Sequence, residues 1–502
     1  MLRKIRIILA TIFFALITLL IVDFTGTLQA YLGWMAKIQF LPAVLALNAV
    51  VILALIILTL IFGRIYCSVI CPLGVMQDVL SSLNRKKNHF SYSPAKSWLR
   101  YAMLIVLIVA VAAGVGSLMA LIAPYGSYTR MAQNLLQPVY IGVNNLLAMA
   151  SEHYSSYAFY HREVWIRSMP TFIVAIVSFV FIAILAIRNG RTYCNTICPV
   201  GTLLGFIARF SWFKVSIDAD KCKNCRKCER NCKASCIDIK NHTVDYSRCV
   251  ACGNCLGQCN FGAMSYAHKP ATKKGDKVAS NKEDKAAAEH GKTNAEGRRE
   301  FLVGAGLALA GTALAKEEKM VDGGLAVIED KIQPKRNTPI TPPGSISAEN
   351  MKRRCVGCQI CVSDCPNDVL RPSTDLMTMM QPVMSFERGY CRPECNRCAS
   401  LCPSGAIKPI TLAEKSSTQI GHAVWVKKNC IPVCDGIDCG NCAAHCPTGA
   451  IQMVHLNGDE TAPMVPAVNE ARCIGCGACE YVCPSRPFSA IYVEGHEVHR
   501  VN

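Results

Sequence analysis

The sequence predicts an α-helical membrane domain of four helices, arranged as a duplicated hairpin, together with two small α+β domains organised around cysteines. Three observations support this division. Four long apolar runs lie in the first half of the chain, a motif of 12 residues occurs twice beside them, and 30 cysteines fall into closely spaced groups. At 502 residues the chain is long enough for two or three domains.

Transmembrane helices are predicted within residues 1–210, where the apolar runs lie. Each run approaches or exceeds the roughly 20 residues that cross the hydrocarbon core of a bilayer. The runs lack the polar faces that buried helices of a water-soluble protein would need, which favours membrane helices. They comprise residues 5–22, 40–62, 101–123 and 170–187.

Lysine and arginine indicate how these helices are oriented. The N-terminus, the loop after the second run and the segment after the fourth run are rich in basic residues, whereas the other two loops carry few. Basic segments stay on the cytoplasmic side, so we expect a multi-pass protein of the bacterial inner (cytoplasmic) membrane. The net charge of +18 is explained by this topology and by solvated faces, and nucleic-acid binding is not expected.

A duplicated motif follows the second and the fourth apolar run. Residues 63–74 read GRIYCSVICPLG, and residues 190–201 read GRTYCNTICPVG. The repeat predicts two helical hairpins related by duplication, with both motifs meeting at one face. The cysteines of the two motifs are candidates for an additional redox or metal site, and the alternative is that they are buried structural thiols: Cys67, Cys71, Cys194 and Cys198.

Cysteine spacing predicts iron–sulfur clusters in the first α+β domain, residues 211–268, which we expect in the cytoplasm. A 4Fe–4S cluster needs four thiolates, and bacterial ferredoxins supply them as Cys-x2-Cys-x2-Cys-x3-Cys groups whose fourth cysteine binds the partner group's cluster. Two such groups occur here, and Cys232 and Cys259 are expected to be exchanged between them. The predicted ligands are Cys222, Cys225, Cys228, Cys232, Cys249, Cys252, Cys255 and Cys259.

The second bacterial-ferredoxin-like domain, residues 345–502, contains four more groups, so six 4Fe–4S clusters are expected in total. Zinc sites usually pair two Cys-x2-Cys units across a longer gap, and disulfides would not require this spacing six times. One group is preceded by both Cys430 and Cys434, of which we favour Cys430. The predicted ligands are Cys355, Cys358, Cys361, Cys365, Cys391, Cys395, Cys398, Cys402, Cys430, Cys439, Cys442, Cys446, Cys473, Cys476, Cys479 and Cys483.

The segments between the two cysteine-rich domains predict export of the second one. Residues 269–297 are charged and almost free of apolar side chains, as in a flexible linker. Residues 298–318 begin with Arg298-Arg299 and continue into a Gly/Ala/Leu-rich run, which is the layout of a twin-arginine export signal or a fifth transmembrane anchor. The C-terminal domain is therefore expected in the periplasm, and the alternative is a short linker helix.

Motifs for other cofactors are missing from the sequence. None of the 11 histidines lies in an apolar run, and no Cys-x-x-Cys-His, Gly-x-Gly-x-x-Gly or P-loop motif occurs. These absences argue against haem between the helices, covalently attached haem, and nicotinamide or ATP sites. The chain is predicted to move electrons rather than to catalyse group chemistry.

On these motifs the chain resembles two ferredoxin-type families. Residues 1–268, with two Cys-x3-Cys-Pro motifs and a two-cluster module, resemble the NapH type, and residues from Arg298 onward resemble the NapG type. MauN and MauM are a similar pair, and the chain looks like a natural fusion of both polypeptides. The resemblance implies a quinol dehydrogenase that passes electrons from quinol or menaquinol to a periplasmic reductase. A lipid-soluble quinone would connect the clusters on the two sides of the membrane.

Two other functions are compatible with the sequence. The chain could reduce copper or another metal at the Cys-x3-Cys-Pro motifs, as in the similar cytochrome oxidase assembly ferredoxins, or it could be a non-catalytic redox-sensing scaffold. For quinol binding, the predicted outer loop offers polar side chains that could equally be interfacial anchors: Tyr125, Tyr128, Arg130, His153, His161, Arg162 and Glu163.

Overall fold

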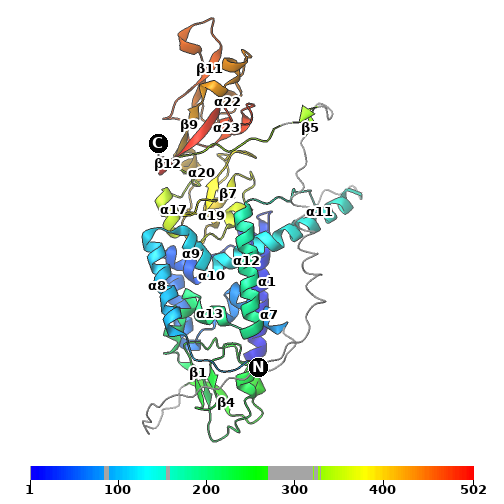
Figure 1. Cartoon of the computed structure of the whole chain (residues 1–502), viewed down its shortest axis with the longest axis vertical. Coiled ribbons are helices and arrows are strands. Elements are labelled where there is room, and N and C mark those ends of the chain that lie inside the picture. Colours follow the sequence, from blue (N-terminus) through cyan, green and yellow to red (C-terminus); the bar gives the residue numbers. More distant parts are fainter. Residues whose placement is uncertain are drawn as a thin grey trace, which may run out of the picture.

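Helices form the middle of the computed structural model, and a cysteine-rich module lies at each end (Figure 1). The structure describes residues 2–83, 90–153, 159–268, 320–321, 326–327 and 329–501. The predicted linker at 269–297 and the predicted export signal or anchor at 298–318 lie outside the described residues. The first module lies on the side of the N-terminus, and the C-terminal domain lies at the opposite end (Figure 1).

Four helices dominate the helical domain: α1 (Leu2–Val22), α5 (Ala49–Phe62), α8 (Ser97–Ala113) and α12 (Met169–Asn189). Among the described residues, two segments are long and apolar enough to cross a membrane, Arg3–Val22 of α1 and all of α12. The helices α5 and α8 have 14 and 17 residues and fall short of that length. Four helices of spanning length were expected, and the structure has two of them.

Two of the predicted spans are shorter because the chain breaks each apolar run into two helices. Run 40–62 divides into α4 (Phe40–Leu45) and α5, with Leu47 at φ 56° and Asn48 accepting a hydrogen bond from the N–H of Val51 at 3.3 Å. Run 101–123 divides into α8 and α9 (Gly116–Ile122) at Gly114, whose φ of 70° ends the first helix.

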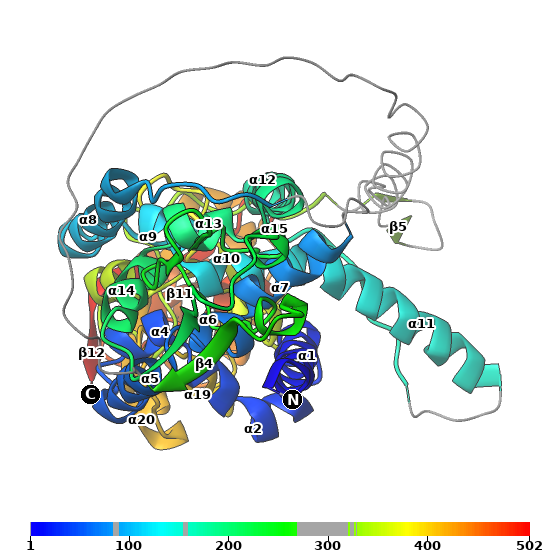
Figure 2. The same ribbon diagram turned by 90° about the horizontal axis from the view of Figure 1, so that it is seen from below.

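The segment 124–169, predicted to be a loop, is largely helical. It forms α10 (Pro124–Met131), the π-helix η1 (Ala132–Leu136) and α11 (Gln137–His153). Every residue of α10 is buried, whereas α11 extends away from the other helices (Figures 1 and 2). The loop between the first two apolar runs also contains two short helices, α2 (Thr27–Leu32) and α3 (Trp34–Lys37).

The two copies of the repeated motif adopt the same local structure. The first forms α6 (Tyr66–Val69) followed by α7 (Pro72–Ser82), and the second forms α13 (Thr192–Thr196) followed by α14 (Pro199–Ala208). In each copy the second cysteine is the N-cap residue and the proline after it is the first helical residue. The sequence repeat is therefore also a structural repeat.

The first cysteine-rich module is a small α+β unit. Its outer strands β1 (Phe213–Ile217) and β4 (Met264–His268) pair antiparallel, with Val215 opposite Tyr266. A second antiparallel pair joins β2 (Ile237–Asp238) to β3 (Thr243–Val244). The short helices α15 (Lys227–Arg230) and η2 (Leu256–Gln258) each lie within a group of cysteines, directly before its last gap ends at Cys232 or Cys259.

The C-terminal domain is also α+β and is built from two-stranded antiparallel sheets. The pairs are β7 (Leu370–Pro372) with β8 (Pro382–Met384), β9 (Thr418–Trp425) with β12 (Ile491–Val501), and β10 (Ile451–His455) with β11 (Met464–Val468). Its short helices are α17 (Ala348–Arg354), α18 (Ile360–Ser363), α19 (Arg397–Leu401), α20 (Leu412–Ser417), η5 (Lys427–Asn429), α21 (Ile431–Cys434), α22 (Asn441–Ala444), η6 (Leu456–Gly458) and α23 (Ala478–Val482). A further pair, β5 (Met320–Val321) with β6 (Ala326–Val327), precedes the domain.

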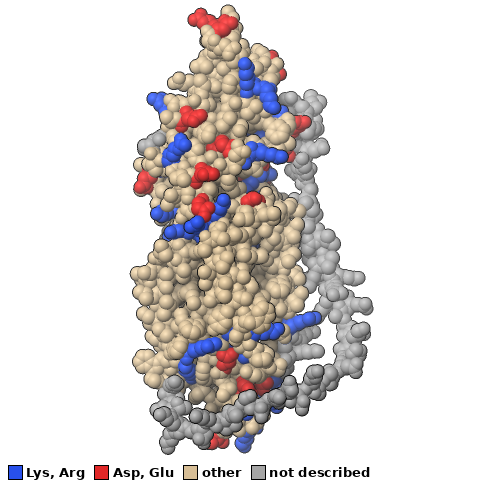
Figure 3. Space-filling view, turned by 60° about the vertical axis from the view of Figure 1, so that its left-hand side comes forward, with Lys and Arg blue, Asp and Glu red and all other residues tan. Residues whose placement is uncertain are grey.

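Charged side chains avoid the middle of the molecule. On the face shown in Figure 3, Lys, Arg, Asp and Glu gather over the two ends, and a broad band between them is formed by other residues. Large apolar side chains of the helices are exposed, among them Val50 (77%), Ile105 (59%) and Val177 (60%). Exposed apolar surface of this extent is typical of an interaction site or a membrane-facing surface.

Candidate metal centres

The first module brings its eight predicted ligands together as two sets of four. Set 1 lines one small cavity and consists of Cys222, Cys225, Cys228 and Cys259. Set 2 lines a second cavity and consists of Cys232, Cys249, Cys252 and Cys255. The fourth cysteine of each group therefore lies with the other group, which is the exchange that the sequence predicts for Cys232 and Cys259.

Backbone geometry favours thiolates in this module. Asn224, Arg226 and Gly253 have positive φ, which curls the chain around the cysteines. Burial raises the pKa of the Cys259 thiol, but hydrogen bonds from the N–H groups of residues 261–264 outweigh it and hold that pKa below its usual value. Iron binds the thiolate form, so the side chains and the backbone around them both fit a 4Fe–4S cluster.

Cys236 is a fifth thiol in the cavity of set 2. Its side chain is buried, and its Sγ lies 3.5 Å from the Sγ of Cys232. The spacing pattern does not assign this residue, and the sequence suggests a spare thiol. The structure places it in contact with a predicted ligand.

The structure separates Cys430 from Cys434. Cys430 is buried and lines a cavity, whereas Cys434 is exposed and its thiol donates to the carbonyl oxygen of Lys428 at 2.9 Å. The cavity contains four cysteines, which we call set 6: Cys430, Cys439, Cys442 and Cys483. The fourth member comes from the last cysteine group of the chain, so the sequence-contiguous group with Cys446 is not the one that forms here.

The other groups of this domain exchange their fourth cysteines in the same way. The thiols in electrostatic reach of one another define set 3 as Cys355, Cys358, Cys361 and Cys402. Set 4 is Cys365, Cys391, Cys395 and Cys398. Set 5 is Cys446, Cys473, Cys476 and Cys479. Each pair of neighbouring groups thus repeats the arrangement of the first module.

Three of the exchanged cysteines share one local feature. A backbone N–H donates to Cys402 Sγ at 3.4 Å, to Cys446 Sγ at 3.3 Å and to Cys483 Sγ at 3.3 Å. Such donors stabilise a thiolate.

Burial and the neighbouring Cys402 raise the pKa of Cys358 to about 12 despite backbone donors, so this thiol needs a metal to become a thiolate near neutral pH.

The sets follow one another from the helical domain outward. Sets 3 and 4 share one module and sets 5 and 6 share the next, and the N–H of Cys391 in set 4 donates to the carbonyl oxygen of Cys476 in set 5 at 2.9 Å. Set 3 lies against the helices, where Arg130 of α10 donates to the carbonyl oxygen of Gly357 at 3.4 Å. The order is therefore 3, 4, 5, 6.

Further contacts attach the C-terminal domain to the helical domain. Arg397 binds the buried Asp364 at 2.7 Å and also donates to the carbonyl oxygen of Thr25 at 3.1 Å. Glu163 pairs with Arg388 at 3.2 Å. Among the outer-loop candidates for quinol binding, Tyr125 and Arg130 are buried near Cys358 of set 3, and Tyr128 is buried with its hydroxyl 2.5 Å from Thr18 Oγ1 of α1. Arg162 and Glu163 pair with the C-terminal domain.

The four cysteines of the repeat also come together in the helical domain. Cys67, Cys71, Cys194 and Cys198 are all buried and lie in electrostatic reach of one another. Within the described part of the chain, no three His, Cys, Asp or Glu side chains are close enough to hold a single metal ion. The six ferredoxin-type sets likewise show no single-ion site, and they are expected to bind an iron–sulfur cluster instead.

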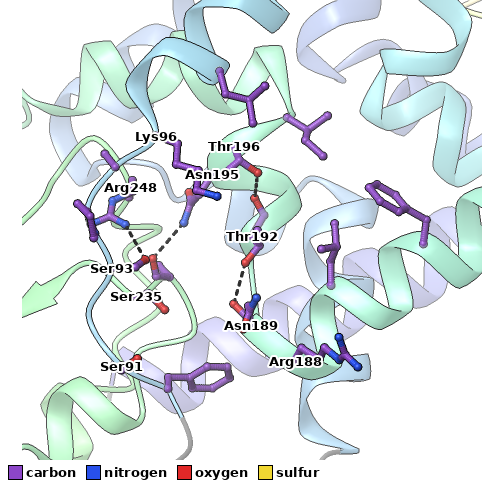
Figure 4. Close-up of a pocket in the computed structure, with 18 residues that line it drawn as sticks. Ser91, Ser93, Lys96, Arg188, Asn189, Thr192, Asn195, Thr196, Ser235 and Arg248 are labelled. Atoms are coloured by element: carbon purple, nitrogen blue, oxygen red, sulfur yellow. Dashed lines mark hydrogen bonds between the residues drawn. The ribbon is translucent and has the colours of Figure 1, made fainter. Parts of the chain in front are cut away.

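A cavity of about 450 Å³ lies between the helices and the first module (Figure 4). Its apolar wall includes Phe181 and Leu185 of α12, and its polar side chains include Lys96, Asn195 and Arg248. Arg248 is buried, donates to Ser93 Oγ at 3.5 Å, and has an Nη2 atom without a hydrogen-bond partner. No sequence motif marks this site, because its walls come from four separate segments of the chain.

Two family models match the chain. One is described as "4Fe-4S binding domain" and matches residues 44–89 and 171–218, and the other is described as "4Fe-4S dicluster domain" and matches residues 434–486. The first model thus matches both copies of the repeat. The second covers sets 5 and 6 in large part.

Named relatives match parts of the chain. The ferredoxin-type protein NapH of Escherichia coli is 25% identical over 228 residues, 44% of this chain and 67% of NapH. The methylamine utilization ferredoxin-type protein MauM of Methylobacillus flagellatus is 33% identical over 93 residues, 18% of this chain and 39% of MauM. Pyruvate synthase subunit PorD of Methanothermobacter marburgensis is 45% identical over 56 residues, 11% of this chain and 68% of PorD. No solved structure matches the chain.

Proposed function

Because the chain belongs to the ferredoxin-type iron–sulfur proteins that transfer electrons, we propose that it is a membrane-bound quinol dehydrogenase. In this proposal a quinol is oxidised beside the first module, and the electrons reach an acceptor at the C-terminal domain. The observation that carries the proposal is the cavity at residues 93–99, 181–197 and 234–248, which adjoins set 2.

The cavity combines the two surfaces that a quinol needs. Phe181, Leu185 and Leu99 line it with apolar surface suited to the ring and tail, and its volume of about 450 Å³ lies within the usual range for small-molecule sites. The buried Arg248 offers an unused N–H donor to a ring oxygen. A buried donor without a partner costs free energy, which a bound acceptor would recover.

The cavity is close to set 2 along the chain as well as in space. Arg248 immediately precedes the ligand Cys249, and the lining residue Ser235 immediately precedes Cys236, which contacts Cys232. A bound 4Fe–4S cluster accepts and releases one electron at a time. A quinol held here would therefore lie beside a one-electron acceptor.

The membrane supplies such a quinol. The apolar band of Figure 3 and the spanning lengths of α1 and α12 support a position across a bilayer, with one cysteine-rich module at each surface. We place the first module in the cytoplasm and the C-terminal domain in the periplasm, following the distribution of basic residues. The acceptor is then an exported reductase, and the matches to both NapH and MauM support a fusion of two ferredoxin-type polypeptides.

The test is reduction of the full chain by quinol. The protein is purified anaerobically in detergent and mixed with a short-chain menaquinol analogue, and loss of visible absorbance and EPR signals report reduced clusters. Leu185→Trp fills the cavity and should slow reduction by quinol about tenfold, equivalent to about 1.4 kcal/mol of binding. Val177→Trp, on the exposed surface of the same helix, is the matched control.

Dithionite should reduce both variants and the natural protein equally, because it does not need the cavity. The proposal is wrong if no quinol reduces the natural protein while dithionite does. Equal quinol rates for the two tryptophan variants would refute the location of the site.

A further inference from the structure

We propose a seventh iron–sulfur cluster, held between the two cysteine-rich modules by the thiols of the repeat: Cys67, Cys71, Cys194 and Cys198. The inference goes beyond the proposed function, because it concerns a metal centre in addition to the six ferredoxin-type sets. It is independent of whether a quinol is the electron donor. We call these four residues the repeat tetrad.

Each copy of the repeat contains half of the ligands that a cluster requires. The family model described as "4Fe-4S binding domain" matches residues 44–89 and 171–218, and each of these segments contains two cysteines. A cubane cluster is held by four thiolates. Only the two copies together provide them, and the fold brings them together.

Two arginines connect the two copies of the repeat by hydrogen bonds. Arg64 of the first copy donates to the carbonyl oxygen of Cys194 at 3.3 Å, and Arg191 of the second copy donates to the carbonyl oxygen of Cys67. A Cβ at Gly74 would overlap the carbonyl oxygen of Cys67, and one at Gly201 would overlap that of Cys194. The reciprocal contacts explain why both copies keep the arginine at the second position of the motif and a glycine at its end.

Every sulfur of the repeat tetrad has a hydrogen-bond donor. Gln77 Nε2 donates to Cys194 Sγ at 3.2 Å, and the N–H of Gly201 donates to Cys198 Sγ at 3.3 Å. The N–H of Gly74 donates to Cys71, and Arg64 Nη2 lies 3.8 Å from Cys67 Sγ. Cys71 and Cys198 also cap the N-termini of α7 and α14, helices of 11 and 10 residues. Donors and helix N-termini stabilise negative charge, as a set of thiolates requires.

Around the repeat tetrad, buried positive charges outnumber the negative charges that pair with them. Arg64 is fully buried, has no ion pair among the described residues, and its Nε has no hydrogen-bond partner. Arg191 is fully buried and pairs with Asp78, which also binds Arg6 at 3.1 Å and Lys233 at 3.7 Å. A buried unpaired cation is costly. An anionic cluster beside Arg64 would offset that cost, whereas four neutral thiols would not.

The position of the repeat tetrad gives the cluster a role. On one side, Arg64 donates to the carbonyl oxygen of Ser247, two residues before Cys249 of set 2, at 3.1 Å. On the other side, the hydroxyl of Tyr193, the residue before Cys194, donates to the carbonyl oxygen of Ile122 at 3.4 Å. Arg130, which follows in α10, donates to the carbonyl oxygen of Gly357 beside Cys358 of set 3 at 3.4 Å. The tetrad therefore lies between the innermost sets of the two modules. A cluster here would connect them through the protein, so no diffusing quinone would be needed between them.

The experiment counts iron in the full chain. Protein purified anaerobically, with its iron–sulfur content reconstituted, is analysed for iron and acid-labile sulfide per chain, with EPR and Mössbauer spectra of the same samples. Seven clusters predict about 28 irons and six predict about 24. Cys67→Ala/Cys194→Ala should lose about four irons and keep the other clusters, while the control Cys434→Ala, at an exposed thiol, should lose none.

Several outcomes would overturn the proposal. A natural protein with about 24 irons would do so, and this measurement stands even if the double variant does not fold. Copper bound in place of iron, or a disulfide between the tetrad thiols in the anaerobic protein, would also refute it. A protein with about 28 irons that no quinol reduces would support the seventh cluster and reject the proposed function.

Discussion

Exchange of the fourth cysteine between neighbouring groups is a prediction that iron counting can decide. In the structure, Cys483 lies with Cys430 in set 6, whereas Cys446 lies with the last group in set 5. Grouping by sequence would instead place Cys430 with Cys446 and leave Cys483 with its own group. The two arrangements use the same cysteines and differ only in which pairs share a cluster.

Pairs of alanine substitutions distinguish the arrangements, because alanine cannot bind iron. Each single change, Cys430→Ala, Cys446→Ala or Cys483→Ala, should remove one cluster, or about four irons. In the structure Cys430 and Cys483 both belong to set 6, so Cys430→Ala/Cys483→Ala should lose only one cluster, or about four irons. Cys430→Ala/Cys446→Ala affects two sets and should lose about eight.

The assay is iron and acid-labile sulfide per chain in anaerobic full-length protein, normalised to protein by amino-acid analysis. Grouping by sequence predicts different losses. Cys430→Ala/Cys483→Ala would then lose about eight irons, and Cys430→Ala/Cys446→Ala would lose about four. That pattern would refute the arrangement described here. The EPR spectrum of the remaining clusters serves as the control for folding.

Three further predictions follow from buried contacts. Asp78→Asn leaves its buried cations without a counter-charge and should lower the free energy of unfolding by about 3–5 kcal/mol, whereas the exposed control Asp218→Asn should leave the thermal midpoint unchanged. Cys434→Ala should keep all cluster iron, because its thiol is exposed and outside the cavity of set 6. Arg397→Ala should destabilise the C-terminal domain at neutral pH, measured by limited proteolysis. Burial raises the pKa of Asp364 to about 6 even with Arg397 present, and loss of this cation raises that pKa further. The variant should therefore regain stability as pH falls below neutrality and the carboxyl is protonated.

The cysteine spacing predicted most of the cysteines that lie together in the structure, because three of the four members of each set are local. In residues 211–268 the two groups follow each other directly, and the exchange of Cys232 and Cys259 could be inferred from the pattern. In the C-terminal domain the group that ends at Cys446 is preceded by both Cys430 and Cys434, so the pattern was less regular, and the folded chain shows Cys430 with Cys483. Local spacing predicts a cluster-binding loop and leaves its distant ligand open.

The membrane domain was predicted less completely. Hydropathy detects apolar runs but not breaks within them, and the breaks depend on single residues such as Asn48, which caps α5, and Gly114, which ends α8. The buried helix α10 was read as an outer loop because Tyr125 and Arg130 are polar. Their burial depends on contacts with the C-terminal domain, such as that of Arg130 with Gly357, which sequence patterns do not contain.

The cavity beside set 2 and the reciprocal arginines could be found only in the structure. Arg248 and Asn195 line one cavity although they lie in different domains. Arg64 and Arg191 stand at equal positions of the repeat, which indicates duplication, but their contacts with the opposite copy appear only in three dimensions. Repeated sequence predicts repeated structure and does not show which surfaces of the copies meet.

The most direct test of the account is the number of clusters that a quinol reduces in the intact chain. Spin quantitation by EPR, on anaerobic protein frozen after mixing with excess menaquinol analogue, gives this number per chain. Electron transfer from the first module to the C-terminal domain predicts more than three reduced clusters, because clusters at sets 1 and 2 and at the repeat tetrad would account for three. A count of three or fewer, in protein whose remaining clusters are present and reducible by dithionite, would contradict it.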